Sequence, residues 1–258
     1  MKSLEVLFTP VDFDALANRN LNEACCVVFD VLRATSTAVT ALANGAEGVV
    51  PVASIPEALA IRSREPDALL AGEREGRRIR AALTGSIDFD LGNSPREFVG
   101  GQARGRKVIM STTNGTRALR ACAGARTVLA CAFLNLQATA EFLLDQDPAQ
   151  LLIIGSGTHE EAAYEDTLGA GALCELVCRK REPGHVADSA LISMRLFRQE
   201  KNRLVDALLE SRNGKRLSEI EDLRDDVAFC AQLDRFPLVA QLGNDGVLRK
   251  RKGTAETR

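Results

Sequence analysis

The sequence is poor in histidine and in large aromatic residues. Its 258 residues include two His, one Tyr and no Trp. A metal centre built from several histidines is therefore excluded, and a mechanism that needs an imidazole has only His159 or His185. Stacking of nucleic-acid bases on aromatic side chains is also poorly provided for, because only 4% of the residues are aromatic.

Long apolar runs and a strong charge of one sign are absent as well. No segment approaches the ~20 apolar residues of a membrane span, and Pro10 follows Met1 too closely for a signal peptide. The formal net charge of −2 gives no field for nucleic acid. The seven cysteines lie mostly in Ala-, Val- and Leu-rich segments, which is typical of reduced, buried thiols. We expect a cytoplasmic protein that binds a small molecule, with no nucleic-acid or membrane partner.

Short apolar runs alternate with Ala- and Leu-rich stretches, as in strands joined by crossover helices. This pattern predicts a three-layer α/β/α fold with a largely parallel or mixed sheet. A single domain is expected over 1–248, divisible at about 104/105, before a flexible basic tail at 249–258. The expected strands are at about 4–9, 25–30, 48–53, 68–71, 106–111, 127–132, 150–154 and 245–249. The expected helices are at about 35–44, 55–64, 115–123, 136–145, 161–179, 186–212 and 225–234.

Two segments, 27–52 and 107–131, share one layout. Each reads as an apolar strand, a polar turn with Thr, an Ala-rich helix, Gly-Ala and a second apolar strand. They therefore predict two βαβ units of similar construction, an arrangement that a duplication would produce.

The first polar cluster follows the apolar run 25–29. Asp30 at the carboxyl end of a buried strand can hold a hard cation such as Mg²⁺, and the Arg33 guanidinium can bind a pair of phosphate oxygens. Thr35 and Ser36 open the next helix, where free N–H groups and hydroxyls bind anions. A helix cap beside a surface arginine is the simpler interpretation of the same residues.

A second cluster repeats this logic after the strand at 106–111. It packs hydroxyls, an amide, a glycine and an arginine into seven residues, more than a helix cap needs, and predicts an anion cradle. Its members are Ser111, Thr112, Thr113, Asn114, Gly115, Thr116 and Arg117.

Two further clusters supply carboxylates and glycines. Glu73 at a strand end is a candidate metal ligand or general base. After the strand at 150–154 come Gly155, Ser156 and Gly157, whose backbone allows close approach of an oxyanion. Glu165 and Asp166 follow, and because neighbours on a helix point about 100° apart, one of the two is expected to reach the site.

Other phosphatase chemistries fit poorly. No Cys and Arg have the spacing of a cysteine phosphatase loop, and the histidines of other phosphatases are missing. Asp12 and Asp88 each begin an Asp-x-Asp segment that departs from the aspartyl-phosphate pattern at its last position. An aspartyl-phosphate hydrolase using one of them stays open as an alternative, as does a non-catalytic protein that only binds a phosphorylated metabolite.

Taken together and in this order, these clusters resemble the 2-phosphosulfolactate phosphatase (ComB) family. The segments that carry the resemblance are DVLRATST at 30–37, GER at 72–74, FDLGNSP at 89–95, STTNGTRAL at 111–119, and Glu165-Asp166 with Ala170-Gly171. The resemblance runs from about residue 4 to 240. It implies a Mg²⁺-dependent phosphatase that converts 2-phosphosulfolactate to sulfolactate and phosphate, a step of coenzyme M synthesis; a related phosphorylated 2-hydroxy acid is a second candidate substrate.

We hypothesise that Asp30, Glu73 and one of Glu165 and Asp166 hold Mg²⁺, which activates the phosphoryl group for attack by water. Glu73 is the candidate base, and a phosphorylated Ser or Thr intermediate stays open. A homodimer is the default expectation for such an enzyme. The anionic oxygens would be bound by Arg33, Arg117, the Ser111–Thr116 cradle and the amides of 155–157.

Overall fold

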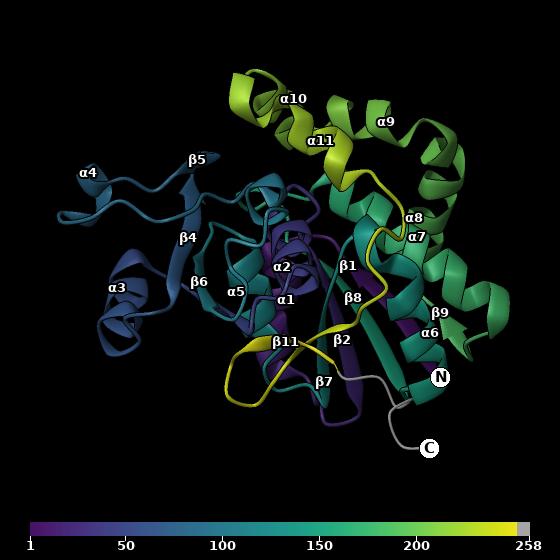
Figure 1. Ribbon diagram of the computed structural model, residues 1–258. Helices are drawn as coiled ribbons and strands as arrows, with labels where there is room; N and C mark the ends of the chain where they lie inside the picture. The colour runs from purple at the N-terminus through teal and green to yellow at the C-terminus, as the bar shows by residue number, and fades with distance from the viewer. Residues whose placement is uncertain (252–258) are drawn as a thin grey trace, which may run out of the picture.

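A computed structural model describes residues 1–251, and it shows the expected three-layer α/β/α fold around one mixed sheet of 11 strands (Figure 1). The spatial order is β5-β4-β6-β3-β11-β10-β7-β2-β8-β1-β9. The strands are β1 (Ser3–Leu7), β2 (Ala24–Phe29), β3 (Gly48–Val52), β4 (Leu69–Arg74), β5 (Arg77–Arg78), β6 (Lys107–Ser111), β7 (Thr127–Cys131), β8 (Gln150–Gly155), β9 (His185–Val186), β10 (Ala240–Leu242) and β11 (Leu248–Lys250).

The central strands form from continuous apolar runs because both of their faces are covered. All six residues of β2 are buried, and this strand pairs in parallel with β7 on one side and β8 on the other. Cys26 and Val28 point into one core, while Cys25 and Val27 point into the other. The strands of a parallel sheet that is buried on both faces have this composition.

Helices cover both faces of the sheet. One core packs against α1, α2 and α5, and the other against α6, α7, α8, α9 and α11, with α3 over a smaller core beside β4 and β6. The helices are α1 (Pro10–Asp14), α2 (Ala34–Ala43), α3 (Ile55–Arg64), α4 (Ala81–Thr84), α5 (Gly115–Ala121), α6 (Leu136–Gln146), α7 (Tyr164–Lys180), α8 (Asp188–Glu200), α9 (Leu204–Glu210), α10 (Arg212–Ser218) and α11 (Arg224–Cys230).

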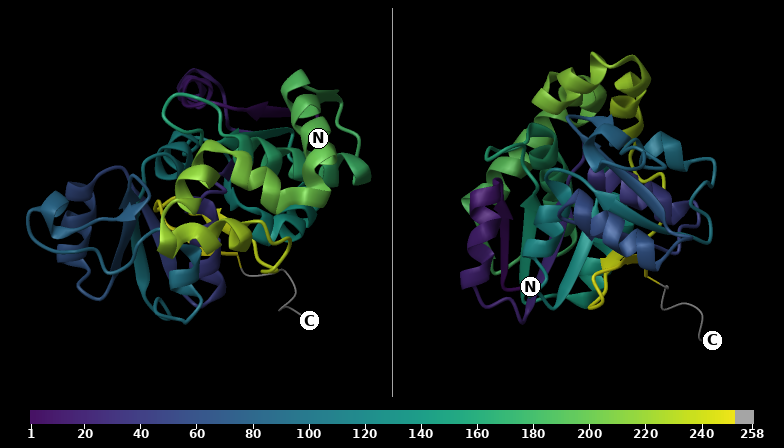
Figure 2. Two further views of the ribbon diagram at one scale, coloured as in Figure 1. Left: turned by 90° about the horizontal axis from the view of Figure 1, so that it is seen from above. Right: turned by 90° about the vertical axis from the view of Figure 1, so that its left-hand side faces the viewer.

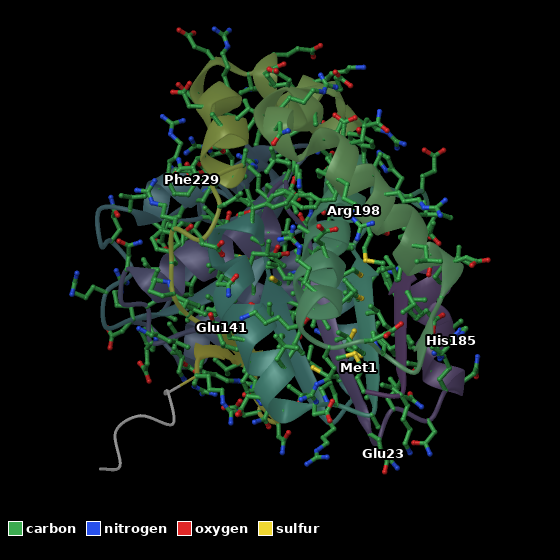
Figure 3. All side chains as sticks on the ribbon, turned by 90° about the vertical axis from the view of Figure 1, so that its right-hand side faces the viewer. Met1, Glu23, Glu141, His185, Arg198 and Phe229 are labelled. Carbon is green, nitrogen blue, oxygen red and sulfur yellow. The ribbon has the colours of Figure 1, made fainter. Side chains whose placement is uncertain are left out.

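The C-terminal helices α9, α10 and α11, residues 204–230, form a cap over one end of the sheet (Figure 1). In the left view of Figure 2 the cap lies across the middle of the molecule. Figure 3 shows the side on which α8 packs on α7, where Arg198 donates to Glu175. None of the helices in residues 1–251 is both long enough and apolar enough to span a bilayer.

The prediction of a single helix over 186–212 is wrong. The chain instead forms β9, α8, a 3-10 turn at Lys201–Arg203, α9 and the start of α10. Arg203 lies at this break and donates to Glu200 on one side and to Glu210 on the other. Ser211 then begins α10 by accepting the N–H of Gly214.

The C-terminal strand prediction also needs correction. Where one strand at 245–249 was expected, β10 and β11 form an antiparallel hairpin in the middle of the sheet. Residues 249 and 250, expected in the basic tail, pair in this hairpin, and 252–258 lie outside the described residues. Every other predicted strand is present within a few residues of its expected bounds.

The two similar units expected at 27–52 and 107–131 are both present, as β2–α2–β3 and β6–α5–β7. β3 and β6 pair on one side of the hairpin of β10 and β11, and β2 and β7 pair on its other side. Each unit therefore begins on one side of the hairpin and ends on the other. The polar turns that end β2 and β6 therefore come from different halves of the sheet. They meet where a side chain at Gly115 would touch Asp30.

Candidate active site

A cavity of about 620 Å³ lies between the strand ends and the cap. Its walls come from the segments that follow β2, β4, β6 and β8, from the hairpin of β4 and β5, and from α10. Binding crevices of open α/β sheets lie at the carboxyl ends of the strands. The predicted site residues that line it are Asp30, Arg33, Glu73, Thr112, Thr113, Asn114, Ser156, Gly157 and Asp166.

Asp30 and Asp166 form the acidic part of the cavity. Asp30 accepts the N–H of Ala34 at 3.0 Å, while Asp166 accepts the N–H of Val31 at 2.8 Å and the Ser156 hydroxyl at 3.0 Å. Burial, with the charges of Glu73 and Glu165, raises the pKa of Asp30 to about 6. Burial, with the charges of Glu165 and Asp30, raises the pKa of Asp166 well above its usual value. These carboxylates are crowded by like charge.

Only one of the neighbouring acids Glu165 and Asp166 reaches the cavity, as the helical geometry predicted. Asp166 lines it, whereas Glu165 lines a separate pocket beside Arg212. Glu165 is buried and accepts the amide of Asn213 at 2.6 Å. Burial raises the pKa of Glu165, while the hydrogen bond from Asn213 opposes this rise.

Glu73 connects two loops of the cavity wall. Its Oε1 accepts the N–H and the hydroxyl of Thr113 at 3.1 and 2.9 Å, and its Oε2 accepts the N–H of Gly76 at 2.8 Å. These bonds tie the turn after β4 to the loop after β6. The orientation of the carboxylate is therefore fixed by three donors.

The loop after β6 divides its polar residues between the cavity and the fold. Thr112, Thr113 and Asn114 line the cavity, and Thr112 Oγ1 is buried with no hydrogen-bond partner among residues 1–251. Thr116 donates to the Thr112 carbonyl, and the Ser111 hydroxyl accepts from Arg74. Of the cradle predicted at 111–116, only residues 112–114 therefore line the cavity.

A glycine is required at position 115 because the two polar turns approach each other closely there. An added Cβ would lie 2.5 Å from Asp30 Oδ2 and 2.7 Å from the Cβ of Ala34. Both distances are shorter than real Cβ contacts, so an L side chain at this position would push the loop away from Asp30. Gly115 acts by permitting contact and does not line the cavity itself.

The hydroxyls of Thr35 and Ser36 are used inside the protein. Thr35 Oγ1 accepts the Asp30 N–H and donates to the Asp30 carbonyl, and Ser36 Oγ donates to the Val31 carbonyl. Neither residue lines the cavity. Their bonds shape the turn that holds Asp30, as the simpler interpretation of this cluster had it.

The glycine-rich segment after β8 presents few free donors. The Ser156 N–H donates to the Phe29 carbonyl at 2.8 Å and the Gly157 N–H to Asp166 at 3.2 Å. Gly155 packs against Asp166 and does not line the cavity. The segment therefore orients Asp166, and its Ser156 hydroxyl is the group that faces the cavity.

The two arginines predicted as phosphate ligands have different surroundings. Arg33 lines the cavity but is buried against Asp226, 2.6 Å from its carboxylate, and it also donates to the Gly76 carbonyl. Arg117 does not line the cavity. It is partly exposed and pairs with Asp14 and Glu160, so the structure does not bring it to the other site residues.

Several cavity residues were not anticipated from the sequence. Asn213 and Arg216 come from α10, which the sequence pattern assigned to the end of one long helix or to no element. Asn93 lies in the FDLGNSP segment, which carried the family resemblance but was given no site role. Asp226 does not line the cavity but holds Arg33. Asn213, Arg216 and Asp226 carry no local pattern that marks them, because they reach the site through tertiary packing of the cap.

Three of the predicted metal ligands, Asp30, Glu73 and Asp166, line the cavity. Within residues 1–251 no three His, Cys, Asp or Glu side chains are grouped closely enough to hold one metal ion, so the expected set of three carboxylates is not assembled. Mg²⁺ is commonly held by one or two carboxylates together with substrate phosphate and water. Burial, together with the charges of neighbouring carboxylates, raises the pKa of Asp30 and of Asp166, and a bound cation would favour their ionised forms.

The two aspartates of the alternative aspartyl-phosphate mechanism lie outside the cavity. Asp12 is exposed and completes a capping box with Thr9 at the start of α1. Asp88 is exposed, and hydrogen bonds from the Ala81 N–H and from Arg80 lower its pKa. Both aspartates have local structural partners, and the geometry gives this alternative no support.

Comparison with known proteins identifies the family of this chain. The family model described as 2-phosphosulpholactate phosphatase matches residues 12–245. A protein of Synechococcus sp. (strain JA-3-3Ab), named probable 2-phosphosulfolactate phosphatase, is 41% identical over 229 residues, covering 87% of this chain and 91% of that protein. Proteins of the same name from Carboxydothermus hydrogenoformans and Pseudothermotoga lettingae are 37% and 38% identical, covering 92% and 96% of this chain and 92% and 99% of their own lengths. The chain therefore belongs to the 2-phosphosulpholactate phosphatase family, which places it among the phosphoric monoester hydrolases.

Proposed function

We propose that this protein hydrolyses the phosphate ester of 2-phosphosulfolactate, with Mg²⁺ as its cofactor. The observation that carries the proposal is the meeting of Asp30, Asp166 and the loop 112–114 at one cavity, in a chain of this family. In the reaction a water oxygen bonds to phosphorus and the bond from phosphorus to the ester oxygen breaks. The ester oxygen leaves with a proton, and the products are sulfolactate and inorganic phosphate.

The phosphoryl group is proposed to lie against the loop after β6. Thr112 Oγ1 is buried at the cavity wall without a partner among residues 1–251, a state that buried hydroxyls seldom keep unless a ligand or water supplies the partner. Asn114 extends the same wall with its side-chain amide, whereas the N–H and the hydroxyl of Thr113 already donate to Glu73. Hydroxyl and amide donors at fixed positions stabilise phosphoryl oxygens as their charge changes.

Asp30 and Asp166 are the proposed ligands of Mg²⁺. The Asp30 carboxylate accepts one hydrogen bond, from a backbone N–H, and so has more free lone pairs for a metal ion. The Asp166 carboxylate accepts three, from Val31, Ser156 and Gly157. When bound, the ion would supply positive charge that polarises the phosphoryl group. The network around Asp166 keeps its carboxylate in one orientation and so pre-forms the site.

Glu73 is proposed to take the proton of the attacking water at Oε2, which accepts one hydrogen bond, whereas Oε1 already accepts two. The side chain is buried and lines the cavity. Its bonds to Thr113 and Gly76 hold the carboxylate in place, and an oriented base within reach of water is what general base catalysis requires. A Glu73→Gln variant keeps the shape and the bond to the Thr113 N–H but cannot take the proton.

The cysteines support the expected reducing compartment. All seven are free, and all but Cys178 are buried. Burial raises the pKa of Cys131 and Cys230 to about 12, so that their thiols stay protonated and unreactive. We propose a cytoplasmic location on this ground. The homodimer expected from the sequence is proposed as the state in solution, and light scattering of the purified protein tests it.

The proposed function is tested by a phosphate-release screen. The purified protein is given 2-phosphosulfolactate and other phosphorylated 2-hydroxy acids, first with Mg²⁺ and then after treatment with a chelator. We expect release from 2-phosphosulfolactate that stops with chelator and returns with Mg²⁺. Preference for another hydroxy acid would change the substrate, and release unaffected by chelator would overturn the role of Mg²⁺. Saturable binding without any release would favour the non-catalytic alternative.

A further inference from the structure

The cavity is lined by several residues whose buried polar atoms have no partner in the described part of the chain. Four buried side-chain atoms in residues 1–251 lack a hydrogen-bond partner, and three of them belong to cavity residues: Asn93 Oδ1, Thr112 Oγ1 and Arg216 Nε. The large majority of buried side-chain polar atoms in proteins have a hydrogen-bond partner. Thr112 belongs to the proposed phosphoryl wall, whereas Arg216 comes from α10 of the cap.

Most of the arginines that line the cavity are already engaged. Arg33, Arg78 and Arg80 pair with Asp226, Glu97 and Asp88 at 2.6, 2.8 and 2.8 Å. Arg74 donates hydrogen bonds to the carbonyls of residues 73 and 111 and to the Ser111 hydroxyl. Within the described part of the chain, Arg77 and Arg216 are the cavity arginines left with neither a carboxylate partner nor such a set of backbone bonds.

Arg216 is held in position even though its Nε is free. Its Nη2 donates to Asn213 Oδ1 at 3.2 Å. The amide of Asn213 is fixed in turn, because its Nδ2 donates to Thr158 at 2.7 Å and to Glu165 at 2.6 Å. At the other side, Arg216 Nε lies 3.9 Å from the place where a Cβ on Gly76 would be. The guanidinium thus reaches from the cap to the turn between β4 and β5.

We propose that Arg216, with Arg77 of β5 as its neighbour on the cavity wall, binds the second anionic group of the substrate, its sulfonate or carboxylate. This inference rests on the proposed function, which supplies a substrate with anions besides the phosphate. A guanidinium presents donors in a planar fork that matches two oxygens of such a group. Arg216 would then be a specificity-determining residue, selecting phosphate esters that carry a further anion.

The test compares three substrates in four proteins. The substrates are 2-phosphosulfolactate, 2-phospholactate, which lacks the sulfonate, and 2-phosphooxypropanesulfonate, which lacks the carboxylate. The proteins are the wild type, Arg216→Gln, Arg216→Lys and the control Lys215→Gln, which removes an exposed charge from the neighbouring position on α10. For 2-phosphosulfolactate we expect kcat/KM to fall about 10- to 100-fold in Arg216→Gln, mostly through KM, the range for losing a charge-assisted hydrogen-bond pair.

The truncated substrates identify the anion that Arg216 binds. The one lacking that anion should lose less than threefold in Arg216→Gln, while the other loses as much as the full substrate. Arg216→Lys should recover part of the KM effect because it keeps the charge but not the fork. An equal loss on all three substrates, or the same effect from Lys215→Gln, would overturn the subsite.

Binding of sulfolactate, measured by calorimetry, separates this inference from the proposed function. If the wild type releases no phosphate from any of the three esters, the proposed function fails, and the subsite is then judged from sulfolactate alone. Tenfold weaker binding in Arg216→Gln than in the wild type supports the subsite. Equal binding in the two proteins, or no binding to the wild type, contradicts it.

Discussion

Arg33 and Asp226 form an ion pair that is almost fully removed from solvent. The distance from Nη1 to Oδ2 is 2.6 Å, and the two side chains are 2% and 0% exposed. Asp226 also accepts the Ser94 hydroxyl at 2.7 Å, and Arg33 donates to the Gly76 carbonyl. The pair therefore joins the turn after β2 to α11 of the cap. Arg33, which the sequence suggested as a phosphate ligand, therefore also connects the sheet to its cap.

The first prediction is that Asp226→Asn strongly destabilises the protein. The substitution keeps the shape but leaves the buried Arg33 charge without its counter-ion, and breaking a buried pair on one side costs about 3–5 kcal/mol. We expect the free energy of unfolding, measured by urea denaturation, to fall by about that amount, and phosphate release to fall with it because the cap loses its attachment beside the cavity.

The neighbouring position provides the control for this prediction. Asp225 is on the same helix, its side chain is 74% exposed, and its contact with Arg96 is long at 3.4 Å. Asp225→Asn should change stability by less than about 0.5 kcal/mol, since exposed pairs contribute little. If Asp226→Asn is no more destabilising than Asp225→Asn, the pair does not hold the cap.

The second prediction concerns pH and Asp30. Burial and neighbouring acids raise the pKa of Asp30 to about 6, against an ordinary value of 3.8. The folded protein then binds more protons than the unfolded chain between these values, so this group makes the metal-free protein less stable as the pH rises from about 4 to about 7. A shift of this size corresponds to roughly 3 kcal/mol.

Asp30→Asn should remove this dependence. In metal-free buffer we expect the variant to unfold at a higher temperature than the wild type at pH 7.5, with the difference shrinking toward pH 5. Phosphate release should fall at least about a hundredfold, because the proposed Mg²⁺ ligand is lost. Scanning calorimetry at several pH values checks the first effect. A stability gain that does not vary with pH would contradict the raised pKa, and near wild-type turnover would remove Asp30 from the mechanism.

The sequence predicted the sheet and the acidic wall of the cavity because both depend on local patterns. Apolar runs of five or six residues mark the buried strands, and strand ends bring their polar residues to one edge, so Asp30, Glu73 and Thr112 were placed together correctly. The cap was missed for the opposite reason. The helices are divided by a 3-10 turn at Lys201–Arg203 and by the Ser211 cap of α10, and both leave the helical periodicity of the sequence almost unbroken.

Hydrogen-bond partners were the other part that the sequence could not supply. Thr35 and Thr113 are both hydroxyls after a strand, yet Thr35 bonds to the backbone of Asp30 and Thr113 lines the cavity. Arg33 lies just before α2 and Arg117 in the first turn of α5, yet Arg33 is buried against Asp226 and Arg117 pairs at the surface. Which partner a polar side chain finds depends on residues far away in the chain.

The third prediction therefore separates these two arginines. Arg117 pairs with Asp14 and Glu160, and its side chain is 41% exposed. Arg117→Gln should leave kcat and KM within about twofold of the wild type and change stability by less than about 1 kcal/mol, as is usual for exposed ion pairs. Steady-state kinetics with 2-phosphosulfolactate measures this. A tenfold or larger loss of kcat/KM would return Arg117 to the phosphate-binding residues.

The fourth prediction concerns the contact between the two polar turns. In Gly115→Ala the new Cβ would meet Asp30 Oδ2 at 2.5 Å, so the loop after β6 has to move, and overpacking of this kind costs about 1–3 kcal/mol. Gly124, which follows α5, has no atom within 4 Å of an added Cβ, and Gly124→Ala should be neutral in stability and in phosphate release. Because Gly115 carries no chemical group of its own, a loss of kcat in Gly115→Ala that exceeds any loss in Gly124→Ala would show that catalysis depends on how closely loop 112–114 approaches Asp30. Equal kinetics in the two variants would mean that this approach is not required.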